Sequence, residues 1–143
     1  MSAPTSAQAT AALTDLLLAC TEGERGFHAA AERIEDPTLR QLCETYAEQR
    51  AAFRLELLDE LAELGECFGG PGGLGWGSPS ARAGVVTLAD LAERDVEVES
   101  TYRRALGQGL PGHASETVER QHRQLSDAAK HLSLVQQVWP QDA

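Results

Sequence analysis

The positions of proline and glycine constrain the fold more than any other feature of this sequence. These residues break or cap helices, and they are almost absent from four long stretches. We predict helices for these stretches, near residues 8–34, 38–65, 86–106 and 114–138. Short joints, Glu35-Asp36-Pro37 and GQGLPG at residues 107–112, separate the first stretch from the second and the third from the fourth. Each joint should fold its two helices into a hairpin.

The connection between the two hairpins is long and rich in glycine. It reads ECFGGPGGLGWGSPSARAGV over residues 66–85, which disfavours a regular helix or strand. One long connection between two short ones is typical of ferritin-like bundles, where a crossover carries the chain along the bundle. A flexible tether between two separate hairpins is the alternative. The predicted fold is all-α: a single ferritin-like four-helix-bundle domain over residues 1–143, made of two hairpins and a long crossover linker.

Composition excludes several classes of function. A chain of 143 residues with 42% hydrophobic content can bury one core. Its net charge of −10 works against binding nucleic acid or an anionic membrane, and no segment is long and apolar enough to span a bilayer. Cys20, Cys43 and Cys67 are odd in number and lack Cys-x-x-Cys spacing, so we expect a reducing, cytoplasmic location. A homodimer is expected from the abundance of helix faces.

Each predicted helix places an ionisable group in its apolar stripe. Spacings of three and four residues align Glu24, Arg50, Glu99 and His122 with core positions, and Asp95 lies one turn from Glu99 as an alternative carboxylate. Pairing the helices about their short joints brings these groups to one level. Because buried charges are costly unless they are paired or bound to a metal, this layer requires an internal partner.

Several short motifs, taken in order and spacing, resemble a known bacterial family. They are Glu22–Phe27 (EGERGF), Asp36-Pro37 with Leu39, Gln49-Arg50 with Phe53, Gly75-Trp76, and Tyr102 followed by Ala105-Leu106 and Leu110-Pro111. The family consists of small ferritin-like four-helix-bundle proteins that carry a domain of unknown function. The resemblance covers roughly residues 13–138. It implies a fold and leaves the activity open.

Ferritin-like di-iron proteins take one Glu from each of two helices and a Glu-x-x-His pair from each of the other two. Glu24, Glu99, Glu119 and His122 match this scheme and are the candidate metal ligands. The second Glu-x-x-His pair is missing, because Ala47 and Arg50 occupy the corresponding positions of the second helix. Arginine cannot deprotonate to become a ligand, so the sequence predicts a degenerate di-iron site.

We therefore interpret the chain as a non-catalytic binding or stress-associated protein without a cofactor. In this interpretation Arg50 replaces a metal and bonds to Glu24 and Glu99, while Glu119 orients His122. The alternative is a metal-dependent oxidase or iron-handling protein that holds a single divalent metal, iron or zinc, with the four remaining ligands.

Overall fold

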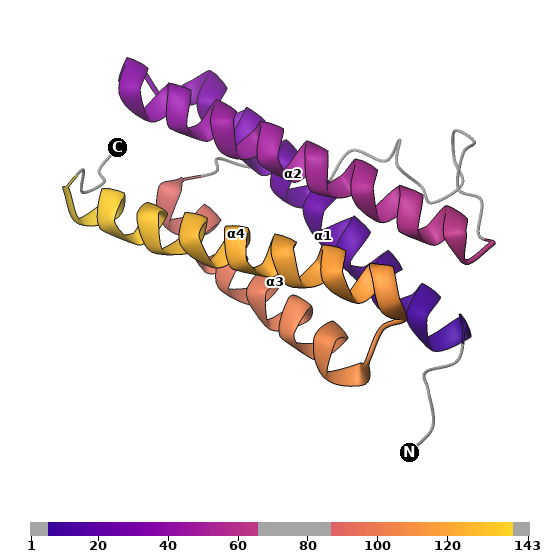
Figure 1. Cartoon of the computed structure of the whole chain (residues 1–143). Helices are drawn as coiled ribbons and strands as arrows, with labels where there is room; N and C mark the ends of the chain where they lie inside the picture. Colours follow the sequence, from indigo (N-terminus) through magenta and orange to yellow (C-terminus); the bar gives the residue numbers. More distant parts are fainter. Residues whose placement is uncertain (1–5, 66–86, 139–143) are drawn as a thin grey trace.

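A computed structural model describes residues 6–65 and 87–138, which form four α-helices (Figure 1). In chain order these are α1 (Ser6–Arg33), α2 (Pro37–Glu63), α3 (Leu88–Gln108) and α4 (Gly112–Val138). The predicted all-α class and both hairpins are confirmed, and the helix boundaries differ from the predicted ones by a few residues. The predicted linker at residues 66–85, with Cys67, Gly75 and Trp76, lies outside the described residues.

Local sequence signals set several of the helix ends. The Asp36 side chain accepts hydrogen bonds from two backbone amides in the first turn of α2, at 2.8 and 3.2 Å, and Pro37 occupies the first helical position. Thr87 and Asp90 form a reciprocal capping box at the start of α3. Gly109 ends α3 with a φ of 82°, a conformation that glycine adopts without a steric penalty. Asp36 thus starts α2 at the first joint, and Gly109 ends α3 at the second.

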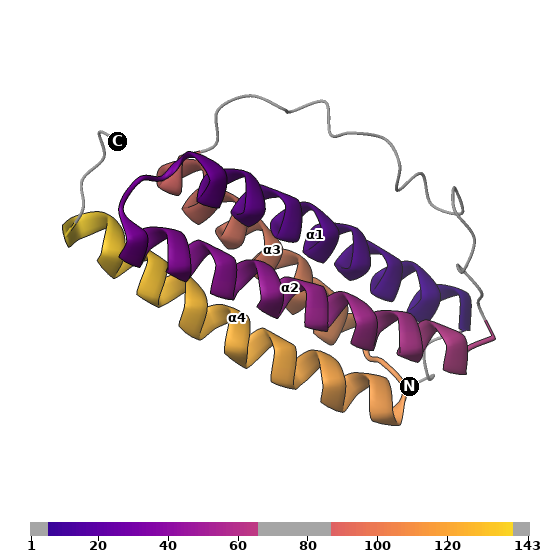
Figure 2. The same cartoon turned by 90° about the horizontal axis from the view of Figure 1, so that it is seen from above.

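Two hydrophobic clusters reveal the directions of the helices. One cluster joins the early parts of α1 and α4 to the late parts of α2 and α3, through Leu13, Val118, Leu61 and Ala105. The other joins the late parts of α1 and α4 to the early parts of α2 and α3, through Ala30, Leu132, Leu39 and Leu88. Thus α1 and α4 run in one direction and α2 and α3 in the other (Figures 1 and 2). Because α2 and α3 are parallel, the end of α2 and the start of α3 lie at opposite ends of the bundle.

Neighbouring helices form a closed ring in the order α1, α2, α4, α3. Helix α1 packs on α2 and α3, and α4 packs on the same two helices, whereas α2 and α3 face each other only across the diagonal. All neighbouring pairs are antiparallel. Any side-chain contact between α2 and α3 must therefore pass through the centre of the bundle.

Within the described ranges, no helix combines the length and the apolar character that crossing a membrane would require.

Candidate functional site

A buried ion pair crosses the centre of the bundle from α2 to α3. Arg50 Nη1 and Nη2 donate to Asp95 Oδ1 and Oδ2 at 2.8 and 3.1 Å, a bidentate geometry. The Arg50 side chain is fully buried and that of Asp95 is 4% exposed. The pair lies between the two hydrophobic clusters, because Ala47 and Leu91 belong to one and Phe53 and Tyr102 to the other. It forms a charged layer between these two clusters.

The surroundings of Arg50 fit a permanent cation. Its Nε donates to the Gln49 side chain at 3.1 Å, and its guanidinium carbon lies 5.2 Å from the centre of the Phe27 ring. An aromatic face attracts a cation at this distance. Gly23 on α1 makes room for the guanidinium, since a Cβ at this position would lie only 3.3 Å from Arg50 Nη1. Three helices therefore shape this site.

The predicted partners of Arg50, Glu24 and Glu99, are wrong. Asp95, which the sequence offered as the alternative one turn away, is the residue that binds the guanidinium. The Asp95 side chain faces the interior and is 4% exposed, whereas the Glu99 side chain lies at the edge of the bundle and is 23% exposed. One helical turn thus decides which carboxylate reaches the centre.

The four candidate metal ligands are dispersed. Glu24 pairs with Arg54 at 3.0 Å, and Glu119 is exposed. Glu99 accepts hydrogen bonds from Ser126 at 3.0 Å and Arg103 at 3.1 Å. Burial opposes ionisation of Glu99, but these bonds and the Arg103 charge outweigh it and lower its pKa. Among the described residues, no group of three or more His, Cys, Asp or Glu side chains is arranged to hold a metal ion.

Of the four, only Glu99 and His122 come close together. His122 Nε2 lies 3.5 Å from Glu99 Oε2, and the imidazole stacks on the Tyr102 ring with centres 6.3 Å apart. The Nε2 atom is buried and has no hydrogen-bond partner. An unsatisfied buried nitrogen is unusual and can act as a metal ligand. With Arg50 at the centre and Glu24 and Glu119 elsewhere, these residues do not fit a two-metal centre.

Sequence reasoning missed a second buried network, centred on Gln121. Tyr102 Oη donates to Gln121 Oε1 at 2.7 Å, and Gln121 Nε2 donates to Glu56 Oε1 at 2.8 Å and to the Phe53 carbonyl at 3.3 Å. The sequence placed His122 in the core stripe of α4, but Gln121 is the fully buried residue. A stripe with the spacing Val118, Gln121, Leu125 would have identified it.

Cys20 extends this network into the apolar core. Its Sγ lies 3.2 Å from Tyr102 Oη, and burial raises the pKa of the thiol from 9.0 to about 11. Burial also raises the pKa of Tyr102 well above 10. Cys20 and Tyr102 are therefore neutral at ordinary pH, and Cys20 is a poor nucleophile because the thiolate is the reactive form of cysteine.

The Cys20 pKa predicts how stability changes at alkaline pH. Between pH 9 and 11 the folded thiol keeps its proton while an unfolded thiol loses it, so stability should fall as pH rises through this window. The contribution of Cys20 is roughly 2–3 kcal/mol, at about 1.36 kcal/mol per pKa unit. Urea titrations across the window should show a shallower decline for Cys20→Ala than for the parent. Equal slopes would contradict the assignment.

Comparison with known proteins adds one finding. Residues 8–70 match the model of a family described as "Domain of unknown function (DUF2383)". The match covers α1 and α2, so the predicted resemblance to a family of unknown function is confirmed over the first hairpin. No protein of curated function matches the chain. The first hairpin is thus similar to a domain family whose description names no activity.

Proposed function

We propose that this chain is a ferritin-like bundle in which an ion pair takes the place of the two-metal centre. The parallel directions of α2 and α3 support the ferritin-like assignment, because a ferritin-like bundle has one long crossover between two hairpins. On this proposal the function is non-catalytic binding. The predictions of a cytoplasmic location and of no nucleic-acid or membrane partner remain part of it.

The observation that carries the proposal is the bidentate Arg50–Asp95 pair across the bundle centre. In the ferritin-like di-iron scheme, the second helix would carry a Glu-x-x-His pair, with a carboxylate at position 47 and an imidazole at position 50. The chain has a fully buried guanidinium and the buried methyl of Ala47 at these positions. Arg50 supplies positive charge without an open coordination position, so it can hold a carboxylate but cannot activate oxygen or water.

Metal content tests the proposal directly. Protein purified without chelator should contain no stoichiometric iron, zinc or manganese, and adding these ions should leave its melting temperature unchanged. Elemental analysis and thermal denaturation measure the two quantities. Stoichiometric metal in the purified protein, together with stabilisation by that metal, would overturn the proposal.

A second candidate function is the binding of one divalent metal at Glu99 and His122, and the unpartnered Nε2 atom of His122 favours it. Carboxylate oxygen and imidazole nitrogen are ligands that zinc and iron accept, with water completing the coordination. If this candidate is correct, zinc should raise the melting temperature of the parent and of His28→Ala, but not of His122→Ala. His28 is the matched control because its side chain is 56% exposed. A parent protein unaffected by zinc eliminates this candidate.

A further inference from the structure

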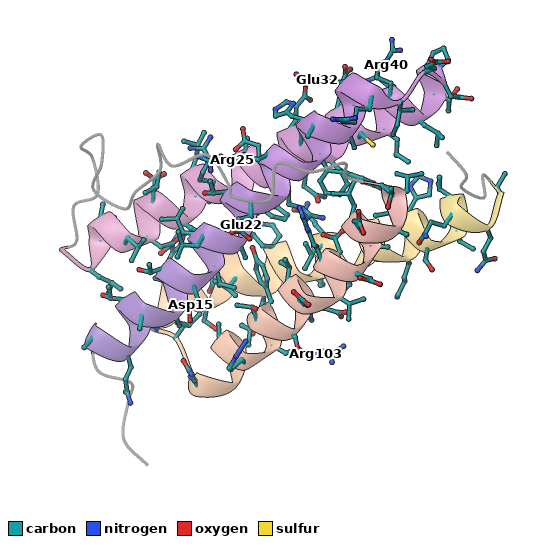
Figure 3. The ribbon with its side chains drawn as sticks, turned by 180° about the vertical axis from the view of Figure 1, so that it is seen from behind. Asp15, Glu22, Arg25, Glu32, Arg40 and Arg103 are labelled. Atoms are coloured by element: carbon teal, nitrogen blue, oxygen red, sulfur yellow. The ribbon has the colours of Figure 1, made fainter. Side chains whose placement is uncertain are left out.

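A groove about 360 Å³ in volume runs between α1 and α3 on one side of the bundle. Its wall on α1 includes Asp15, Leu18 and Glu22, and its wall on α3 includes Arg94, Val98 and Arg104. Figure 3 views the molecule from this side and shows Asp15 and Glu22 along α1. Leu18 is 42% exposed here.

Four charged side chains that line this groove lack the ion pairs that charges elsewhere in the bundle form. Glu24 with Arg54 bridges α1 and α2, and Glu56 with Arg120 bridges α2 and α4. Across the part of the chain that the structure describes, Asp15, Glu22 and Arg94 form no ion pair, and Arg104 makes only a 3.4 Å hydrogen bond to Thr101. The α1 wall thus carries two unpaired acidic groups, and the α3 wall carries two arginines without an ion pair beside the acidic Glu97.

We propose that this face binds a second copy of the chain, with a two-fold axis parallel to the helices. Such an axis lays α1 of each copy over α3 of the other and keeps every residue at its level along the bundle. Asp15 and Arg104 line one small pocket together, so they share a level and would oppose one another between copies. Charge complementarity of this kind sets the register and orientation of an interface.

The second charged pair follows from the same geometry. A Cβ at Gly26 would lie 3.2 Å from Arg94 Nη1, which places this guanidinium about one turn beyond Glu22. The long Arg94 side chain of one copy can then reach Glu22 of the other. Glu97 lies on the same wall as Arg94, and its negative charge would repel the acidic wall of the other copy. Arg94, three residues earlier on the same helix, offsets this charge.

The alternative axis, perpendicular to the helices, opposes α1 to α1 and places the acidic wall against itself. Like charges disfavour that arrangement. The parallel axis pairs opposite charges and covers the exposed Leu18 side chains. A closed two-fold interface of this type is the commonest form of association in soluble proteins.

Charge reversal tests this interface. Sedimentation equilibrium of the parent at micromolar concentration should give about twice the chain mass of 15.3 kDa. Asp15→Arg and Arg104→Asp should each give the single-chain mass, because each places like charges opposite one another twice. An equimolar mixture of these two variants should return to the double mass, since both contacts between unlike copies are again opposite in charge. The Asp15→Arg/Arg104→Asp double variant should also recover it.

Glu48→Arg is the matched control, because it makes the same charge change at an exposed position on α2 outside the groove. It should behave as the parent does. Circular dichroism establishes that each variant is folded, and only association between chains can explain rescue by mixing. A monomeric parent would overturn the proposal. A mixture of the two variants that stays monomeric would also overturn it, and this outcome is expected if residues 66–86 of the same chain fill the groove.

Discussion

Replacing Arg50 with alanine is expected to destabilise the protein by roughly 3–5 kcal/mol, the usual effect of removing one partner of a buried ion pair. Asp95 would keep a buried charge without a counter-charge, and Phe27 would lose its cation contact. Urea denaturation of the parent and of Arg50→Ala gives the free energy of unfolding. This change should be among the most damaging single substitutions on α2.

Arg54→Ala is the matched control for this experiment. Arg54 also lies on α2 and pairs with a carboxylate of another helix, but its side chain is 28% exposed and that of Glu24 is 21% exposed. A pair this accessible to water contributes about 0.2–1 kcal/mol. If Arg50→Ala were no more destabilising than Arg54→Ala, Arg50 and Asp95 would not form a buried ion pair at the centre of the bundle.

A paired replacement separates the net value of the ion pair from the damage of breaking it. Replacing a buried pair with apolar residues of similar volume is often neutral or stabilising by about 1–4 kcal/mol. Arg50→Met combined with Asp95→Leu should therefore recover most of the stability that either single substitution loses. A double variant as unstable as Arg50→Ala would mean that Arg50 acts mainly through contacts other than Asp95.

Rebuilding the missing Glu-x-x-His pair is expected to create metal binding. Ala47 and Arg50 are both fully buried and face the interior of α2, so Ala47→Glu with Arg50→His directs a carboxylate and an imidazole towards the centre. Removing Arg50 also frees Asp95 to act as a third ligand. A metal present at about 100 times its dissociation constant should stabilise this variant by roughly 2.7 kcal/mol.

The readout for the rebuilt site is the metal dependence of stability. Adding a longer side chain at position 47 overpacks the core and should cost about 1–3 kcal/mol, so the metal-free variant will be less stable than the parent. Ala47→Glu with Arg50→Leu carries the same overpacking but lacks the imidazole, and it should show little response to iron or zinc. Equal responses of the two variants would show that the new carboxylate binds metal without help from the introduced imidazole.

Much of the fold was predictable because local signals determine it. Pro37, the cap at Asp36 and the glycine at position 109 fix where helices begin and end. Apolar residues at spacings of three and four define the buried faces, and they correctly placed Arg50 and Asp95 in the interior. The sequence also indicated that the buried cation required a carboxylate.

The tertiary structure decided which groups meet. Asp95 and Glu99 both follow the stripe of α3, and only the rotation and register of α3 against its neighbours bring Asp95 to the centre and leave Glu99 at the edge. The same rotation of α4 buries Gln121 in place of His122 and exposes Glu119. Helical periodicity predicts which side of a helix is buried only to within about one residue, which is roughly 100° of rotation about the helix axis. A hydrogen bond requires its two heavy atoms to lie within about 3 Å, so periodicity cannot select its partners. The chain alone therefore determined four amphipathic helices with a charged layer, and packing of all four helices determined the pairs within that layer.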